Sequence, residues 1–260
     1  MKLQALLCIS LFCTTPLYMF AKNFNSNTVA ADTSKRNSPS LYKVARLHKK
    51  MPIDANWNKP EWKKAKAVKI TNYMGKLPDF KPQAEAKMLY DDGNVYVIFR
   101  VKDRYVHSVV EEYNGNVSGD ACVEFFFAPD THFPERYFNL EINAGGTPLL
   151  FYILPPYPQA EYTKLSPEDI NQIEIAHSLP KVVDPEIKDP VTWTLEYRIP
   201  FSMLEKFSNV TRPAPGVIWK ANFYKTASHS SNPHWITWSV VDNPKPNFHL
   251  PKFFGTLEFK

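Results

Sequence analysis

The chain has 260 residues, 44% of them hydrophobic, which is enough apolar material for a sizeable core. Its net charge is +5, but the Lys and Arg residues are scattered along the sequence. No basic stripe or nucleic-acid-binding motif is present, so we expect no nucleic-acid partner.

The N-terminal residues are typical of a signal peptide. A single early lysine precedes an apolar run that Pro16 interrupts and that is too short to span a bilayer. We expect a signal peptide over residues 1–21, with cleavage as late as residue 31 as the alternative. A flexible leader rich in Asn, Ser, Thr and Lys is expected over 22–40, followed by one folded domain over 41–260. The protein is therefore expected to be exported, to the periplasm, the cell surface or the medium, without a membrane span.

The cysteines exclude an intramolecular disulfide in the processed chain. Cys8 and Cys13 lie within the expected signal peptide, so only Cys122 remains. A lone cysteine within a strand pattern is interpreted as a half-buried packing residue rather than a nucleophile.

Strand signals dominate the remainder of the chain. Runs of β-branched and aromatic residues alternate with turn residues, and the 23 prolines fall mainly in the connections. The expected strands, in chain order, are residues 42–47, 66–70, 83–90, 95–101, 121–128, 137–143, 147–154, 173–176, 192–199, 217–224 and 256–259. Single helical turns are expected at 60–65 and 200–206, and longer excursions at 104–120 and 155–190. This pattern predicts an all-β fold, an antiparallel β-sandwich with few short helical turns.

Two interpretations are open for the turn Asp91-Asp92-Gly93-Asn94. A type I′ hairpin turn suits these residues, because Asp, Gly and Asn tolerate positive φ angles. Oxygen-rich turns also suit Ca²⁺, so a structural calcium ion is possible, although no dense Asp/Asn loop is present and we expect no other metal or cofactor.

Alternation along several strands predicts a polar face opposite the apolar one. One interpretation is that this polar face is the ordinary solvent-exposed face of an antiparallel sheet. Carboxylates, amides and guanidinium groups that lie close together can also hold the vicinal hydroxyls of a sugar. The polar members of this face are Arg100, Glu124, Asn139, Glu141, Glu196, Arg198, Asn222 and Tyr224.

The C-terminal region adds aromatic residues to this picture. Trp235 and Trp238 are three residues apart, so on an extended strand they point to opposite faces, and we expect Trp238 in the core and Trp235 exposed. An exposed Trp can stack on the CH face of a pyranose. The other four tryptophans, Trp57, Trp62, Trp193 and Trp219, lie in apolar segments and are expected in the core. The predicted binding residues are Glu124, Asn139, Glu141, Arg198, Asn222, Trp235, Phe248 and His249.

An ordered set of short segments resembles family-9 carbohydrate-binding modules. These segments are IDANW (53–57) with PEW (60–62), LYDDGNVYV (89–97), VKD (101–103), DACVEFF (120–126), WTLE (193–196) with IPF (199–201), GVIWKANFY (216–224) and FGTL (254–257). The resemblance implies a jelly-roll or immunoglobulin-like β-sandwich related to DOMON domains. It also implies that Glu124 belongs to the polar set around the sugar, with Asn139 and Glu141 on the following strand.

Two departures concern the pair of Trp rings between which such modules hold a sugar. One of these rings would lie near Val117, where this chain has no aromatic residue. The other would lie just before the terminal FG, where Phe248 or His249 stands.

The sequence as a whole predicts an exported, non-catalytic carbohydrate-binding protein that assists polysaccharide degradation. One alternative is a glycoside hydrolase of the endo-xylanase type, with Glu124 and Glu141 as acid and base. The other is a DOMON-like haem or redox-sensing domain, with Met88 and His249 as axial ligands. No HExxH, GxSxG or phosphate-loop motif is present, and no catalytic residue is predicted.

Overall fold

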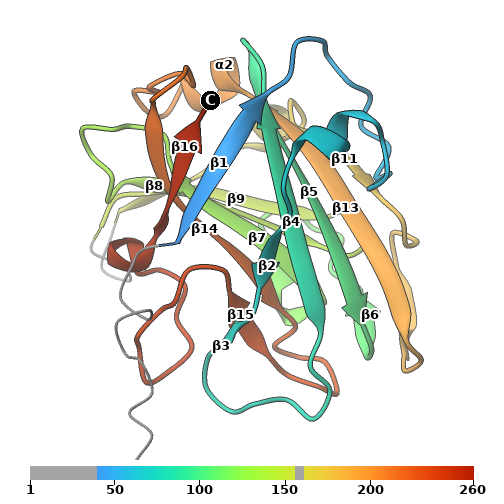
Figure 1. The fold of residues 1–260 in the computed structure, drawn as a ribbon. Helices are drawn as coiled ribbons and strands as arrows, with labels where there is room; N and C mark the ends of the chain where they lie inside the picture. Colours follow the sequence, from blue (N-terminus) through green and yellow to red (C-terminus); the bar gives the residue numbers. More distant parts are fainter. Residues whose placement is uncertain (1–39, 156–160) are drawn as a thin grey trace, which may run out of the picture. The chain divides into compact units, whose positions relative to one another are not determined.

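A computed structural model describes residues 40–155 and 161–260 (Figure 1). The expected signal peptide and nearly all of the expected leader lie outside these residues. Five short helical segments are described: η2 (Glu61–Lys64), η3 (Val117–Gly119), η4 (Pro251–Phe253), α1 (Pro167–Ile170) and α2 (Phe201–Leu204). The strands are β1 (Leu41–Arg46), β2 (Val68–Ile70), β3 (Asn72–Tyr73), β4 (Gln83–Tyr90), β5 (Asn94–Asp103), β6 (Val106–Ser108), β7 (Cys122–Ala128), β8 (Tyr137–Asn143), β9 (Pro148–Ile153), β10 (Tyr162–Lys164), β11 (Glu174–His177), β12 (Val183–Ile187), β13 (Val191–Pro200), β14 (Ile218–Thr226), β15 (Trp235–Thr237) and β16 (Gly255–Phe259).

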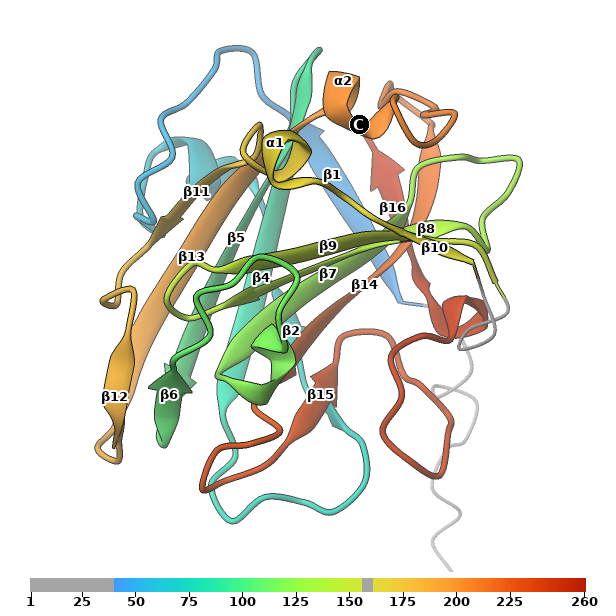
Figure 2. The same cartoon turned by 180° about the vertical axis from the view of Figure 1, so that it is seen from behind.

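The strands form two layers that share one strand. The first layer has the order β10-β9-β8-β7-β14-β16-β1, and the second has the order β1-β4-β5-β13-β11. β1 joins them because Leu41–Val44 pair with β16, whereas Ala45 and Arg46 pair with β4. Both of these pairings are parallel, while the other neighbouring strands in the two layers run antiparallel. Strands of the two layers cross steeply, as in an orthogonally packed sandwich (Figures 1 and 2). The predicted all-β sandwich is confirmed.

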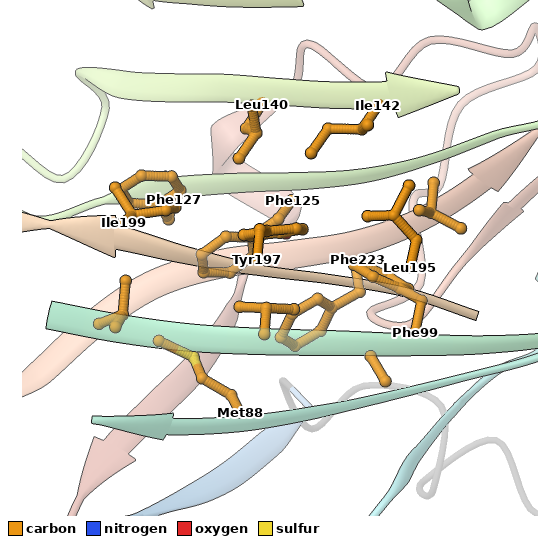
Figure 3. Packing of buried hydrophobic residues seen from close by; sticks show 14 of the residues in the cluster. Met88, Phe99, Phe125, Phe127, Leu140, Ile142, Leu195, Tyr197, Ile199 and Phe223 are labelled. Carbon is orange, nitrogen blue, oxygen red and sulfur yellow. The ribbon is translucent and has the colours of Figure 1, made fainter. Parts of the chain in front are cut away.

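The apolar faces of the two layers meet in a core rich in aromatic rings. Phe125 and Phe127 of β7 face Phe99 of β5 and Tyr197 of β13 across the interface (Figure 3). The ring of Phe125 stacks on Phe223 of β14 at 4.9 Å between ring centroids. Alternation predicted this inward set, because successive side chains of a strand point to opposite faces.

The tryptophans expected in the core are buried, but at two different places. Trp193 and Trp219 lie between the layers. Trp57 and Trp62 instead pack on the outer face of the second layer, against Tyr96 and other apolar residues there. The segment that carries these two rings therefore covers part of the second layer.

The carboxylate of Glu196 holds the segment that carries Trp57 and Trp62 against the second layer. Glu196 of β13 is fully buried and accepts hydrogen bonds from the backbone N–H groups of Asp54 (3.0 Å) and Ala55 (2.7 Å). It also accepts bonds from Lys59 Nζ (2.7 Å) and Trp62 Nε1 (2.9 Å). In the turn whose N–H groups donate to this carboxylate, Ala55 has a φ angle of 58°, in the left-handed region that favours glycine.

The hairpin turn between β4 and β5 differs from the expected type I′ turn. Neither Asp92 nor Gly93 has a positive φ angle, which a type I′ turn requires at both positions. The side chain of Asp91 dictates the turn instead: its Oδ1 accepts hydrogen bonds from the N–H groups of Gly93 (2.8 Å) and Asn94 (2.7 Å). Its other oxygen accepts from the Tyr96 hydroxyl at 2.5 Å. Within the described part of the chain, no group of three or more Asp, Glu, His or Cys side chains could hold a metal ion.

Candidate functional site

A cavity of about 270 Å³ lies on the outer face of the first layer, over β7, β8 and β14. Five of the predicted binding residues line it, namely Glu124, Glu141, Trp235, Phe248 and His249. Its other lining residues are Ser118, Phe126, Thr226, Pro246 and Asn247. The cavity thus collects strand residues and C-terminal loop residues that are far apart in the sequence.

Strand register places the two carboxyl groups side by side. β7 and β8 pair antiparallel with Glu124 directly opposite Glu141, and Tyr224 of β14 is opposite Glu124 on the other side. Side chains of directly opposed residues lie on the same face of a sheet as close neighbours. The face is not solvated: Glu124 is 2% exposed and Glu141 7% exposed. Both side chains are therefore removed from water while still bordering the cavity.

Aromatic rings of the C-terminal loop cover this face. Phe248 stacks on Tyr224, with 4.1 Å between ring centroids and 15° between ring planes, and its carbonyl accepts a hydrogen bond from the Tyr224 hydroxyl. The ring of His249 lies 5.1 Å from that of Phe126 and its Nδ1 is 2.9 Å from the Tyr137 hydroxyl. These contacts fix the loop that forms one wall of the cavity.

Trp235 forms part of the wall from β15, where it pairs with Thr226 of β14. It is half-buried, whereas Trp238 is 8% exposed and packs in the core between the layers. The prediction that Trp238 lies in the core and that the two rings point to opposite faces is confirmed, whereas Trp235, expected to be exposed, is half-buried against the apolar residues of the outer face.

Burial and mutual repulsion shape the electrostatics of the cavity. Burial raises the pKa of Glu124 well above its ordinary value, and the neighbouring Glu141 raises it further. Burial also raises the pKa of Glu141, to about 7, against the opposing effect of hydrogen bonds from Asn139 and Ser118. Burial lowers the pKa of His249 to about 4, so its ring is neutral at neutral pH. Glu124 and Glu141 are thus the acidic groups among the lining residues, and burial raises the pKa of both.

Asn139 is next to the cavity rather than part of its wall. Its Nδ2 donates to Glu141 Oε1 at 3.1 Å, and its Oδ1 accepts from the N–H of Phe151 at 3.1 Å. With both ends of the amide bonded in this way, Asn139 orients the Glu141 carboxyl group.

Asn222 also has an internal role in the structure. Its Oδ1 accepts hydrogen bonds from the N–H groups of Ser239 (2.8 Å) and Phe223 (3.0 Å), and its Nδ2 donates to the Ser239 carbonyl (3.0 Å). The side chain is fully buried, and its hydrogen bonds connect β14 to the segment that follows β15.

The expectation that Arg198 shares the face of Glu124 is wrong. Arg198 is on β13, which belongs to the second layer, and its Nη2 pairs with Glu174 at 2.7 Å. The outer faces of the two layers lie on opposite sides of the sandwich, so the structure does not bring Arg198 to the cavity.

The structure also excludes the Met88–His249 pair of the alternative haem-binding interpretation. Met88 is fully buried between the layers, whereas His249 lies on the outer face of the first layer. The β7 strand and its neighbours separate the two side chains, so they cannot bind opposite faces of one iron.

A larger cavity, of about 470 Å³, lies over β2, β4 and β5 of the second layer. Lys69, Lys81 and Lys102 line it and are exposed, and Arg100 is paired with Glu85 at 2.6 Å. None of the predicted binding residues lines this cavity. The smaller cavity is the better candidate site because its polar groups are buried and face aromatic rings.

Five lining residues were not predicted. Phe126 and Thr226 are two positions from Glu124 and Tyr224 on their strands, so the same alternation places them on this face. Ser118, Pro246 and Asn247 lie outside the regular strands. No pattern in the sequence indicates that these three approach the carboxyl groups.

Comparisons with known proteins identify the family of the chain. The family model described as Carbohydrate-binding family 9 matches residues 49–259. A solved structure from Bacteroides uniformis ATCC 8492, described as a candidate carbohydrate-binding protein, is similar with a TM-score of 0.74 and 27% identity, over 86% of this chain and 100% of that one.

Two solved structures described as a family-9 module from Caldicellulosiruptor kristjanssonii share the fold at 16% identity. The complex with cellotriose has a TM-score of 0.57, over 85% of this chain and 94% of that one. The complex with glucose has a TM-score of 0.55, over 85% and 96%. A comparison with curated proteins finds no match. The extent of the family match shows that the chain belongs to carbohydrate-binding family 9.

Proposed function

We propose that this protein binds carbohydrate, without cleaving it, in the cavity lined by Glu124, Glu141 and the aromatic rings of the C-terminal loop. The observation that carries the proposal is the convergence of two buried carboxyl groups and a half-buried Trp on one cavity. Sugars present both hydroxyl groups and apolar CH faces, and this site offers partners for both.

The chemistry of each lining group supports this role. A carboxylate accepts hydrogen bonds from hydroxyl groups, and such charge-assisted bonds are roughly twice as strong as neutral ones. Trp235 has exposed ring surface on which the CH face of a sugar can stack, worth about 1–3 kcal/mol by analogy with other aromatic stacking. Asn247 and Thr226 add further hydrogen-bonding groups to the wall.

The placement of the carboxyl groups favours binding over hydrolysis. Glycosidases place their two carboxyl groups on either side of the scissile bond. Glu124 and Glu141 are instead directly opposed residues of adjacent strands, so both approach a ligand from the same wall.

A second part of the proposal concerns where the protein acts. An exported protein that holds glucan-type chains for a polysaccharide-degrading system suits the signal peptide pattern at the N-terminus. It also suits the cellotriose and glucose bound by the Caldicellulosiruptor modules. No helix among the described residues is long and apolar enough to cross a membrane.

Calorimetry on the purified protein tests the proposal, after a glycan array has identified the preferred sugars and with cellotriose as the first ligand. Trp235→Ala should lower the affinity by about 1–3 kcal/mol, roughly 5- to 150-fold. Phe133→Ala is the matched control, because Phe133 is an exposed aromatic residue of the β7–β8 loop outside the cavity. Equal affinities for Trp235→Ala, Phe133→Ala and the unaltered protein would place the site elsewhere, and thermal melts would show whether both variants remain folded.

A further inference from the structure

The cavity contains acidic groups but no cation. Among its described lining residues, Glu124 and Glu141 are the acids, and no Lys or Arg is present. His249 is not a counter-ion, because its ring is held neutral by burial. The remaining lining residues are uncharged.

Glu124 in particular lacks a partner that would compensate its burial. Its side chain borders the cavity, yet within the described part of the chain its carboxyl group accepts no hydrogen bond. The cation that acts on it is Lys225, the next residue after Tyr224 on β14 and therefore on the opposite face of that strand. The Lys225 ammonium group already contacts Asp103 Oδ2 at 3.3 Å and His234 Nε2 at 2.9 Å.

The other titratable groups near the pair do not supply positive charge. Cys122 on β7 is a buried thiol, and Tyr224 on β14 and Tyr137 on β8 are buried phenols. The Asp120 carboxyl group, which follows η3, accepts hydrogen bonds from the N–H groups of Val109 and Val110 at 3.0 and 2.9 Å. Within the cavity no cation balances the charge of the carboxyl pair, so a proton neutralises part of it in the free protein and a cationic ligand can take the place of that proton.

We propose that the cavity selects saccharides that carry a protonated amino group, the hexosamine class, whose ammonium group binds between Glu124 and Glu141. This inference rests on the proposed carbohydrate-binding function and names the ligand class for the same site. A hydroxyl group offers one donor and no charge, whereas an ammonium group offers three donors and one positive charge. The rings of Trp235 and Phe126 add to the preference, since aromatic faces attract cations.

A matched set of three trimers tests the selection by calorimetry on the purified full chain. Cellotriose, the glucosamine trimer and the N-acetylglucosamine trimer have the same linkage and differ only in a hydroxyl, an ammonium or a neutral amide substituent. At a pH where the amine is protonated, the glucosamine trimer should bind roughly tenfold or more tightly than cellotriose. The N-acetylglucosamine trimer should show no such gain.

The number of protons released to the buffer on ligand binding provides an independent test of the inference. Two adjacent buried carboxyl groups share a proton in the free protein, because both cannot ionise so close together. An ammonium group between them stabilises the doubly ionised form, so binding of the glucosamine trimer should release protons to the buffer. Repeating the titration in buffers of different ionisation enthalpy measures that release, and cellotriose should release none.

Variants link the preference to the carboxyl pair. Glu141→Gln and Glu124→Gln should each remove most of the preference for the amine while retaining some affinity for cellotriose. Glu174→Gln, which changes a carboxyl group of the second layer, should retain the preference in full. The inference is overturned if the glucosamine trimer and cellotriose bind equally, or if the preference persists in both site variants. Equal binding would leave carbohydrate binding itself intact, whereas absence of binding by all three trimers would remove both proposals.

Discussion

The carboxylate of Glu196 is expected to contribute more to stability than any exposed carboxylate of the second layer. Glu196→Ala removes the common acceptor of two backbone N–H groups, of Trp62 Nε1 and of Lys59 Nζ. Lys59 is only 5% exposed, so its charge would lose its buried partner and keep the half-exposed Asp54 at 2.8 Å.

The magnitude follows from these contacts. Breaking a buried ion pair by removing one partner costs about 3–5 kcal/mol. Each buried donor left without an acceptor costs about 1–3 kcal/mol, although the segment can relax and let water reach some of these donors. We therefore expect Glu196→Ala to lower the free energy of unfolding by about 4 kcal/mol, which corresponds to a melting temperature lower by roughly 8–16 °C. Glu196→Gln keeps an acceptor in place and should cost about half as much.

Urea denaturation followed by tryptophan fluorescence measures the effect, with Glu174→Ala as the control. Glu174 is a half-exposed carboxylate in the same layer, paired with Arg198, and its loss should cost less than about 1 kcal/mol. Similar small losses for Glu196→Ala and Glu174→Ala would refute the reasoning, because they would mean that the segment over residues 53–65 is not held by this carboxylate.

Three further outcomes are expected. Ala55→Gly should raise the free energy of unfolding by about 0.5–1 kcal/mol, because the residue has a φ angle of 58°; a loss of stability in a urea titration would argue against strain at this turn. Burial and mutual repulsion raise the pKa values of Glu124 and Glu141, so the folded state holds protons more tightly than the unfolded state. Stability should therefore fall as the pH rises from about 4.5 through about 7, and Glu141→Gln should flatten this dependence in melts over that range. Burial raises the pKa of the Cys122 thiol, so a thiol reagent should modify it only after unfolding, and rapid modification of the native protein would contradict its placement.

The alternation of residues along the sequence was sufficient to predict the positions of the long strands of the sandwich. The expected strands at residues 83–90 and 137–143 coincide with β4 and β8, because alternation over seven or eight residues leaves little ambiguity. The short strands β6, β10 and β12 were not predicted. Each has only three to five residues and depends on one neighbouring strand, so its pairing partner rather than its own sequence determines it.

The candidate site shows a different limit of the sequence. Alternation identifies which side of a strand faces away from the core, and it did so for Glu124 and Glu141. It does not identify the layer to which a strand belongs, so it grouped Arg198 with residues on the far side of the molecule. Nor does it reveal that Ser239 satisfies Asn222 or that loops bury the carboxyl pair, because those facts depend on contacts distant in sequence.

The position of the last strand has a consequence for how the domain folds. β16 lies between β14 and β1, so Leu41–Val44 of β1 can join the first layer only after residues 255–259 are in place. Leu41 pairs with Thr256, which means that this contact closes a loop of nearly the whole domain. Contacts of such long sequence separation slow folding, since the entropy of loop closure is lost before the pairing is gained. A nascent chain that lacks residues 255–259 would leave an edge of β14 and the Leu41–Val44 edge of β1 unpaired, and these edges would be open to aggregation until β16 has been made.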